Sequence, residues 1–396
     1  MKLKRLAEDF QVEEQVSLAP SGGPLAMYLL TKESLGTLEA IEAIRRRWKL
    51  DRGRIAFAGL KDKHAQTRQF VTIEGGPPRN LSEESFRLEY LGPAARPIHA
   101  SDILSNAFTV VIRELSEAEA QAASAALSAA TQFGVPNYFD DQRFGSLGES
   151  GHFIAEPWCR GDYERTLWLA LAEPNARDRP EDREQKRLLR DHWGQWQRCG
   201  ELLARSERQR VAGFLESSRG DFRRAIGLLR QDLRSLWLAA YQSQLWNQVL
   251  AALLREVCRP EQLAPQTIGR RELPMFDALE SEQFERLRAT QLPLPSARLH
   301  LERGPLQELY DRVLAAEGIA LRELRVKYPR DSFFSKGERA VLLLPQAVEQ
   351  SAAADELYPG RRKLTLRFSL ARGSYATILI KRVTGSMVEW EGDDVV

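Results

Sequence analysis

Cysteine is scarce in this chain, which has three cysteines in 396 residues. That number is odd, and the positions of Cys159, Cys199 and Cys258 offer no disulfide framework. We therefore expect the chain to work in a reducing compartment, the cytoplasm. No apolar run reaches membrane-spanning length, and residues 1–5 begin without the apolar core of a signal peptide. We therefore expect no membrane partner.

Ligand clusters for metals and nucleotides are also missing from the sequence. The five histidines are scattered, with no HExxH pattern and no Cys/His pair at zinc spacing. No glycine-rich loop ends in Lys followed by Ser or Thr, as a Walker loop does. A glycine-rich strand–helix start, which a cofactor-dependent methyltransferase would need, is absent too. The sequence therefore predicts chemistry without a metal ion or an organic cofactor.

Charge of one sign is not in excess, since the net charge is only +2. Bulk charge therefore does not indicate a nucleic-acid-binding protein, and local clusters carry more information. A basic run of Arg45, Arg46, Arg47 and Lys49 lies at the end of a helix predicted over residues 37–48, with Thr37 as its N-cap. These side chains could complement the helix C-terminus, contact RNA phosphates, or do both.

One carboxylate stands between two lysines in the most informative segment of the chain. Residues 55–58 predict a short buried strand, and the alternation over residues 69–73 predicts the next one. Asp62 would then lie in a connection that two strands hold rigidly. Lys61 and Lys63 would keep Asp62 ionised, so that it could act as nucleophile or base, or they would meet phosphates. A turn aspartate flanked by solvated lysines is the simpler alternative.

Aromatic and amide side chains gather in a second loop, residues 134–145. The preceding helix is predicted to begin with a capping box at Ser116, and Pro136 prevents its continuation. Asn137 and Phe139 therefore emerge at a helix exit, where they could hydrogen-bond and stack an unstacked base. A hydrophobic plug around a buried arginine–carboxylate pair is the alternative.

Five short segments carry a recognisable pattern along nearly the whole chain. They are residues 8–14, 58–69 around Asp62, 105–109, 136–145 and 373–377. Together and in this order they resemble the motifs of the TruD family of tRNA pseudouridine synthases. Departures from the family pattern are Ala7 in place of proline, Asp140 in place of glycine and Tyr375 in place of phenylalanine.

This resemblance implies isomerisation of uridine to pseudouridine in tRNA, at position 13. It implies that Asp62 is catalytic, and it leaves open whether Asp62 attacks C1′ or removes a sugar proton to give a glycal. Phe139 would stack on the flipped uracil, and Asn137 would hydrogen-bond the polar edge of the base. The remaining implied residues are Phe10 and Tyr375, which would close the pocket, and Lys4, an ionic partner for Asp62.

The candidate RNA-binding residues are all basic: Arg45, Arg46, Arg47, Lys49, Lys61, Lys63 and Arg143. His64, beside the aspartate, is assigned a structural or RNA-facing role. The expected partner is tRNA, without an obligate protein partner. A non-catalytic RNA-binding or RNA-chaperone protein of the same fold is the alternative function, although the presence of Asp62 favours catalysis.

The secondary-structure pattern is β-rich at both ends and helical in the middle. Further strands are predicted over residues 10–16, 25–30, 86–91, 108–115, 364–370 and 376–383. In the middle, helices are predicted over residues 181–197 and 235–257, and a loop over residues 264–269. The basic residues Arg183, Lys186, Arg187 and Arg190 of that region form one candidate surface for selecting the RNA.

The predicted fold class is α+β, with a mixed or antiparallel sheet in the catalytic domain. By the family resemblance, this catalytic domain is discontinuous in sequence and comprises residues 1–156 and 347–396. An inserted α-rich domain of the TRUD type would occupy residues 157–346.

Overall fold

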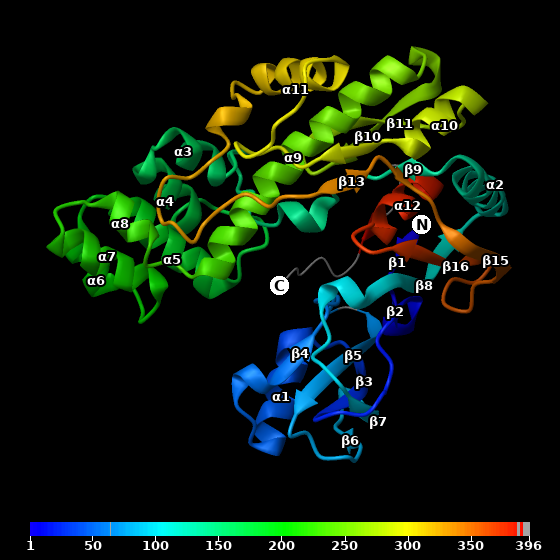
Figure 1. The fold of residues 1–396 in the computed structure, drawn as a ribbon, viewed down its shortest axis with the longest axis horizontal. Coiled ribbons are helices and arrows are strands. Elements are labelled where there is room, and N and C mark those ends of the chain that lie inside the picture. Colours follow the sequence, from blue (N-terminus) through cyan, green and yellow to red (C-terminus); the bar gives the residue numbers. More distant parts are fainter. Residues whose placement is uncertain (64, 386–388, 391–396) are drawn as a thin grey trace. The chain divides into compact units, whose positions relative to one another are not determined.

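The computed structural model describes residues 1–63, 65–385 and 389–390 (Figure 1). The chain forms two compact units: unit 1 is Met1–Asn137 with Leu342–Val396, and unit 2 is Tyr138–Val341. Unit 1 is thus built from both ends of the sequence, and unit 2 lies between them in the chain. The predicted domains at 1–156, 157–346 and 347–396 stay a prediction.

A mixed sheet forms the framework of unit 1 (Figure 1). Its strand order is β15 (Gln346–Ala354), β16 (Arg362–Ala371), β8 (Ile103–Leu115), β2 (Phe10–Val16), β5 (Gln66–Glu74), β3 (Leu25–Glu33), β7 (Phe86–Ala94) and β6 (Leu81–Ser82). Off this path, β4 (Ile55–Phe57) pairs with β5, while β1 (Lys2–Leu3) pairs with β8 and β17 (Glu389–Trp390). On the path, β2 and β5 run parallel and their neighbours antiparallel. The predicted fold class is confirmed.

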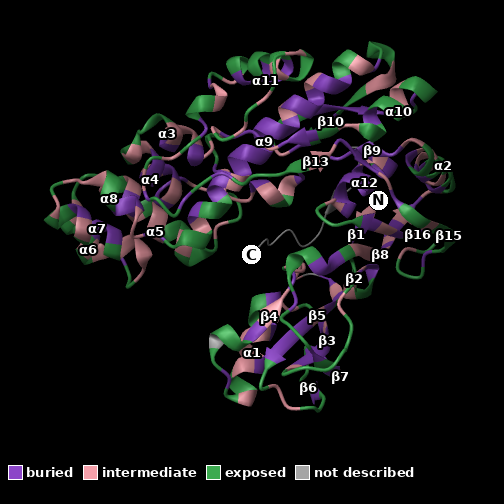
Figure 2. Cartoon of the chain, viewed as in Figure 1, coloured by how far each residue is buried: buried purple, intermediate pink, exposed green. Residues whose placement is uncertain are grey.

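Helix α1 (Thr37–Trp48) packs its apolar stripe against the β3, β5 and β7 part of the sheet. Ala40 and Ile44 are fully buried there. The Trp48 ring lies 5.4 Å from the ring of Tyr28. Figure 2 shows buried residues concentrated along these strands. This core fixes the end of the sheet from which the Asp62 connection emerges.

Helix α2 (Glu117–Phe133) has the predicted capping box and a glycine at its end. The Glu119 amide donates to Ser116 Oγ, and the Ser116 amide donates to Glu119 Oε2 at 2.7 Å. Gly134 follows with φ of 75°, and a Cβ there would lie 2.8 Å from Leu344. The chain then enters β9 (Val135–Pro136), which pairs antiparallel with β14 (Leu342–Leu343). The chain therefore leaves unit 1 and returns to it through two paired strands.

A buried ion cluster connects the two sequence segments of unit 1. Arg113 of β8 donates to Asp9 Oδ1 at 2.8 Å and to Asp355 Oδ1 at 3.1 Å. These three side chains are at most 3% exposed, and Arg113 also contacts the exposed Glu356 at 2.9 Å. Asp9 ends the short 3₁₀ helix directly before Phe10. The cluster therefore holds the start of β2 against the C-terminal strands.

Unit 2 is mainly helical and has short two-stranded sheets. Its elements are α3 (Ala155–Arg160), α4 (Tyr163–Leu171), α5 (Pro180–Asp191), α6 (Trp196–Leu202), α7 (Glu207–Ser217), α8 (Phe222–Ile226), α9 (Gln231–Val257), β10 (Leu263–Ile268), β11 (Arg271–Phe276), α10 (Ser281–Ala289), β12 (Gln291–Pro293), α11 (Pro305–Ala316) and β13 (Glu338–Ala340). Helix α9 is central, and Leu238, Tyr241, Leu245 and Val249 are buried on it. Unit 2 is therefore organised around this one long helix.

Two predicted elements take a different form from the one expected. Residues 376–383, predicted as a strand, form helix α12 (Ala376–Thr384), which packs on α2. Nearly every residue of α12 is buried, and an apolar run without alternation does not distinguish a buried strand from a buried helix. Residues 264–269, predicted as a loop, include most of β10. Pro265 is tolerated there because a two-stranded ribbon consists only of edge strands.

Two further expectations concern helix boundaries. The predicted helix over residues 181–197 is interrupted between α5 and α6, where Gly194 has φ of 88°. A backbone at that angle cannot continue a right-handed helix. Thr37 is the first residue of α1 rather than its N-cap, which is Gly36. The Thr37 hydroxyl instead accepts a hydrogen bond from the Lys61 amide, in the connection between β4 and β5.

Candidate active site

Asp62 lies in the connection between β4 and β5, beside a buried lysine from the N-terminus. Lys4 Nζ is 2.6 Å from Asp62 Oδ2, and the two side chains are 5% and 22% exposed. The same ammonium lies 4.6 Å from the centre of the Phe10 ring. Lys4 has φ of 55°, so it turns the chain between β1 and the 3₁₀ helix that leads into β2. Unit 1 thus brings together Lys4, Phe10 and Asp62, three residues predicted for the site.

A second lysine, Lys32, binds the backbone of the same loop. Lys32 of β3 is 1% exposed, and its ammonium donates to the carbonyls of Asp62 at 2.8 Å and Leu35 at 2.6 Å. Burial lowers the pKa of Lys32 to about 8, while the charges of Asp62 and Glu39 oppose that shift. The sequence does not predict this role of Lys32, because a lysine in a strand has no local pattern that reveals such a contact.

Neutral side chains fix two more backbone positions of the loop. Thr37 Oγ1 accepts a hydrogen bond from the Lys61 amide at 2.9 Å and donates one to Gln69 Oε1 at 2.9 Å. Gln69 Nε2 in turn donates to the Gly59 carbonyl at 3.2 Å. Thr37 and Gln69 are buried. The loop that carries Asp62 is therefore tied to β3, α1 and β5 by side chains.

The two lysines that flank Asp62 have carboxylate partners elsewhere. Lys61 Nζ lies 3.0 Å from the buried Glu14 and also donates to Asn106. Lys63 Nζ lies 3.4 Å from Glu39. Lys4 supplies a close positive charge to Asp62, and the prediction that Lys61 and Lys63 keep Asp62 ionised stays a prediction. Lys61 therefore helps to hold the loop, and its contact with the RNA backbone stays a prediction.

Three of the recognised sequence segments meet at Lys61. Glu14 comes from residues 8–14, Lys61 from residues 58–69 and Asn106 from residues 105–109. Strand β2 lies between β5 and β8 in the sheet, which brings these segments together. Glu14 also accepts a hydrogen bond from the Phe70 amide at 3.0 Å. Residues from these three short motifs therefore jointly hold the loop that carries Asp62.

Phe139 belongs to unit 2, where its backbone is held at both hydrogen-bonding groups. The Phe139 amide donates to Asn247 Oδ1 at 2.9 Å, and Asn247 Nδ2 donates to the Phe139 carbonyl at 2.8 Å. The ring meets Trp246 edge to face, with 5.4 Å between centroids. The guanidinium of Arg339 lies 4.2 Å from the ring centre, and that of Arg143 lies 5.6 Å away. Phe139 is thus rigidly mounted on α9 and 9% exposed.

The other residues predicted for the site lie beside strands and helices of the two units. Asn137 directly follows β9 and is 4% exposed. Tyr375 is half-buried and precedes α12. Both belong to unit 1, whereas Phe139 and Arg143 belong to unit 2. His64 lies outside the described residues.

Carboxylates partly neutralise the basic run at the end of α1. Arg45 and Arg46 both bind Glu42, at 2.7 and 2.8 Å, and Arg47 lies 3.6 Å from Glu83. The hydrogen bonds from Arg45 and Arg46 lower the pKa of Glu42 to about 2. Lys49 is exposed at the C-cap. The run therefore presents less positive charge than the sequence suggests.

Within residues 1–63, 65–385 and 389–390, no group of three or more His, Cys, Asp and Glu side chains is arranged to hold a metal ion. Among the helices of these residues, none is long and apolar enough to cross a membrane.

Comparisons with known proteins agree over nearly the whole length. A family model described as tRNA pseudouridine synthase D (TruD) matches residues 1–383. A probable tRNA pseudouridine synthase D 2 of Methanocaldococcus jannaschii is 30% identical over 96% of this chain and 91% of its own. The tRNA pseudouridine synthase D of Aquifex aeolicus is 28% identical over 98% of this chain and 99% of its own. The crystal structure of the TruD protein from Methanosarcina mazei has the same fold, with a TM-score of 0.71 at 24% identity over 96% of this chain and 93% of that one.

Proposed function

This chain belongs to the tRNA pseudouridine synthase D family, and we propose that it isomerises uridine 13 of tRNA with Asp62 as its catalytic residue. The observation that supports this assignment is the mounting of Asp62. Its carboxylate is paired with Lys4, and its carbonyl is held by Lys32. A turn aspartate without a chemical role would not need a buried lysine on each side. Rigid support of this kind is what a reacting group requires.

The chemistry needs one carboxylate and no added reactant. The N1–C1′ bond of uridine breaks, the uracil turns, and C5 bonds to C1′. The proton lost from C5 is balanced by the proton gained at N1, so neither water nor an oxidant is consumed. Asp62 would attack C1′ or remove a sugar proton, and Lys4 at 2.6 Å favours the ionised carboxylate in either route.

The base must leave the RNA stack before Asp62 can reach the sugar. We assign Phe139 to stacking on the extruded uracil and Asn137 to its polar edge, with Phe10 and Tyr375 closing the pocket. In support of this role, the Phe139 ring already has a flat, polar partner in the guanidinium of Arg339. Stacking on an aromatic ring is worth about 1–3 kcal/mol per base.

The proposed partner is the tRNA, which would be met in the cytoplasm. Of the basic residues predicted to bind RNA, Arg46, Arg47, Lys49 and Lys63 lie on unit 1, and Arg143 lies on unit 2. Arg45 donates two hydrogen bonds to Glu42, which leaves its guanidinium less available to phosphates. We propose that the inserted domain, predicted over residues 157–346, selects the RNA rather than performing the chemistry.

The direct test is to incubate purified protein with an unmodified tRNA transcript and to map pseudouridine by position. We expect modification at position 13, and none in a matched transcript with cytidine there. Modification at another position would refute the assigned target. Tight binding of the tRNA with no pseudouridine at any position would instead identify a non-catalytic RNA-binding protein.

A further inference from the structure

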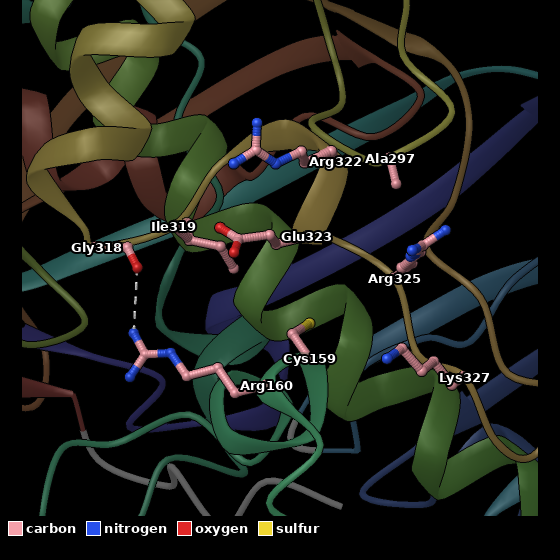
Figure 3. A pocket seen from close by; sticks show the side chains of 9 residues that line it. All are labelled: Cys159, Arg160, Ala297, Gly318, Ile319, Arg322, Glu323, Arg325 and Lys327. Atoms are coloured by element: carbon pink, nitrogen blue, oxygen red, sulfur yellow. Dashed lines mark hydrogen bonds between the residues drawn. The ribbon is translucent and has the colours of Figure 1, made fainter.

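A hollow surface of unit 2 carries exposed cations that have no carboxylate partner among the described residues. Two adjoining pockets, of about 520 and about 340 Å³, share Ala297, Arg325 and Lys327 in their walls. Figure 3 shows the first of them, with basic side chains from α3 and from the segment after α11. We name the whole region the Arg325 surface, which consists of Arg298, Arg322, Arg325, Lys327, Arg330 and Phe333.

The charge of this surface is not cancelled locally. Its five basic residues are exposed, and none of them forms an ion pair with a carboxylate in the described part of the chain. Asp331, next to Arg330 in the chain, binds Arg234 at 2.7 Å. Among the described residues, Glu323 is the one carboxylate in the walls of the two pockets, where it accepts a hydrogen bond from the Ala320 amide at 2.8 Å, so the five cations outnumber it. An excess of unpaired positive charge in a hollow attracts polyanions.

Helix α5 of the same unit shows the opposite arrangement. Lys186 binds Asp178 at 2.6 Å, and Arg187 binds both Glu184 and Asp191 at 2.7 and 2.8 Å. Arg190 donates to the carbonyl of Ala172 at 3.0 Å. The cations predicted as a candidate RNA-selecting surface are thus largely used in internal contacts. The two regions have similar basic content in the sequence but differ in the charge available to a ligand.

The backbone that carries the Arg325 surface is anchored from behind. Trp158 Nε1 donates to the Tyr328 carbonyl at 2.9 Å, and the Ala297 amide donates to the Leu324 carbonyl at 3.0 Å. Leu324 and Phe334 are buried beneath the exposed side chains. The cations therefore project from a fixed segment, and binding a ligand would not require that segment to fold.

One large aromatic side chain lies beside these cations. Phe333 is 58% exposed although its neighbour Phe334 is buried, and Arg298 lies 5.8 Å from its ring centre. An exposed aromatic next to a basic groove is the combination with which proteins bind nucleic-acid strands, since the ring stacks on a base and the cations follow the phosphates. Neither feature alone would distinguish RNA from another anion.

We propose that the Arg325 surface binds the phosphate backbone of the tRNA substrate, with Phe333 stacking on an accessible base. This inference rests on the proposed function for the identity of the RNA. A single phosphate would favour converging, buried donors, whereas these cations are exposed and spread over two hollows. A protein partner would favour an apolar interface core, and this surface offers one exposed aromatic ring.

The test measures the affinity of an unmodified tRNA transcript over a series of salt concentrations. The first variant combines Arg322→Ala, Arg325→Ala, Lys327→Ala and Arg330→Ala. Each phosphate contact that is lost should reduce the slope of log affinity against log salt by about 0.7 to 0.9. Phe333→Ala should weaken tRNA binding about fivefold or more at unchanged slope. Phe333→Tyr, which keeps an aromatic ring, should bind tRNA with nearly the wild-type affinity. Thermal melting checks folding, which these exposed substitutions should leave intact.

The matched control combines Arg183→Ala, Lys186→Ala, Arg187→Ala and Arg190→Ala, which removes the same charge from the same unit. Its affinity and slope should stay close to those of the wild type. Equal losses in both quadruple variants would overturn the proposal, because they would indicate an effect of total charge. Wild-type affinity and slope in the first variant would overturn it as well.

A second probe separates RNA from other polyanions. If the first variant loses binding to phosphatidylserine vesicles but keeps its tRNA affinity, the surface serves a membrane and the proposal is overturned. The proposed function is measured separately, as pseudouridine formation by the wild type. An active wild type with an unaffected first variant removes only the Arg325 surface, whereas an inactive wild type removes the proposed function.

Discussion

The ammonium of Lys32 donates a hydrogen bond to the carbonyl of Asp62 at 2.8 Å, from a position that is 1% exposed. Lys4 binds the carboxylate of the same residue. One lysine therefore holds the main chain of Asp62 and another holds its side chain. Buried lysines are uncommon because removing an ammonium from water is costly. Two of them at one aspartate indicate that its position matters more than local stability.

Replacing Asp62 by asparagine should abolish catalysis and leave the fold intact. Asparagine has nearly the same shape but no negative charge, so it can act neither as nucleophile nor as base. We expect single-turnover pseudouridine formation to fall at least about a hundredfold, with tRNA affinity and melting temperature near those of the wild type. Asp51→Asn, the same change at an 89% exposed side chain, is the control. Near-normal turnover by the Asp62 variant would remove it from the catalytic role.

Replacing Lys32 by methionine should change how stability depends on pH. The folded pKa of Lys32 is about 8, below its ordinary value of 10.5. Between these values the unfolded chain binds more protons, so this group makes the folded state more stable as pH rises. The free energy of unfolding of the wild type, measured relative to that of Lys32→Met, should therefore rise from pH 8 to pH 10.5. Below pH 7 this relative value should be constant.

Denaturant unfolding of both proteins across that range checks this prediction. Turnover at pH 7 should fall as well, because the Asp62 carbonyl loses its donor. A stability difference that is flat across the range would show that Lys32 titrates normally. Unchanged turnover would show that the bond from Lys32 does not position Asp62.

Replacing Asn247 by alanine should loosen Phe139. The change leaves the buried amide and carbonyl of Phe139 without their partner, and each such group costs about 1–3 kcal/mol. We expect reduced stability in denaturant unfolding together with slower pseudouridine formation. The neighbouring change Gln248→Ala is the control, since the amide nitrogen of Gln248 has no hydrogen-bond partner among the described residues. Equal effects of the two changes would argue against a specific role of Asn247.

Replacing Arg113 by alanine should strongly destabilise unit 1. It leaves the carboxylates of Asp9 and Asp355 buried without their counter-charge, a change that typically costs about 3–5 kcal/mol. The exposed pair Arg367–Glu349 provides the comparison, because Arg367→Ala should alter stability by no more than about 0.5 kcal/mol. Similar effects of the two substitutions on denaturant unfolding would contradict the importance of the buried cluster.

Local patterns predicted the elements that have a local cause. Helix α2 was predictable because Ser116 and Glu119 cap it and Gly134 ends it. Helix α12 was not, because burial on nearly all sides removes the periodicity that separates helix from strand. The segment around Asp62 was recognisable as a motif. Its supports, Lys32 and Thr37, act through contacts across 24 to 30 residues, which no local pattern records.

The ion pairs of the basic residues were likewise not predictable from the sequence. The sequence counts lysines and arginines but does not say which of them have partners. Arg187 and Arg325 are both exposed members of basic segments, yet Arg187 contacts two carboxylates and Arg325 none in the described chain. Only the folded structure distinguishes a cation used for internal contacts from one available to a ligand.

The pairing of β9 with β14 has a consequence for the place at which unit 2 is inserted in the chain. Pro136 lies directly opposite Leu342, so the points where unit 2 begins and ends are neighbours in one antiparallel ladder. An antiparallel ladder can be closed by a two-residue turn such as Asn-Gly. Unit 2 is therefore inserted at one place in unit 1. Recombination could exchange it for another domain without a change in the strands of the sheet.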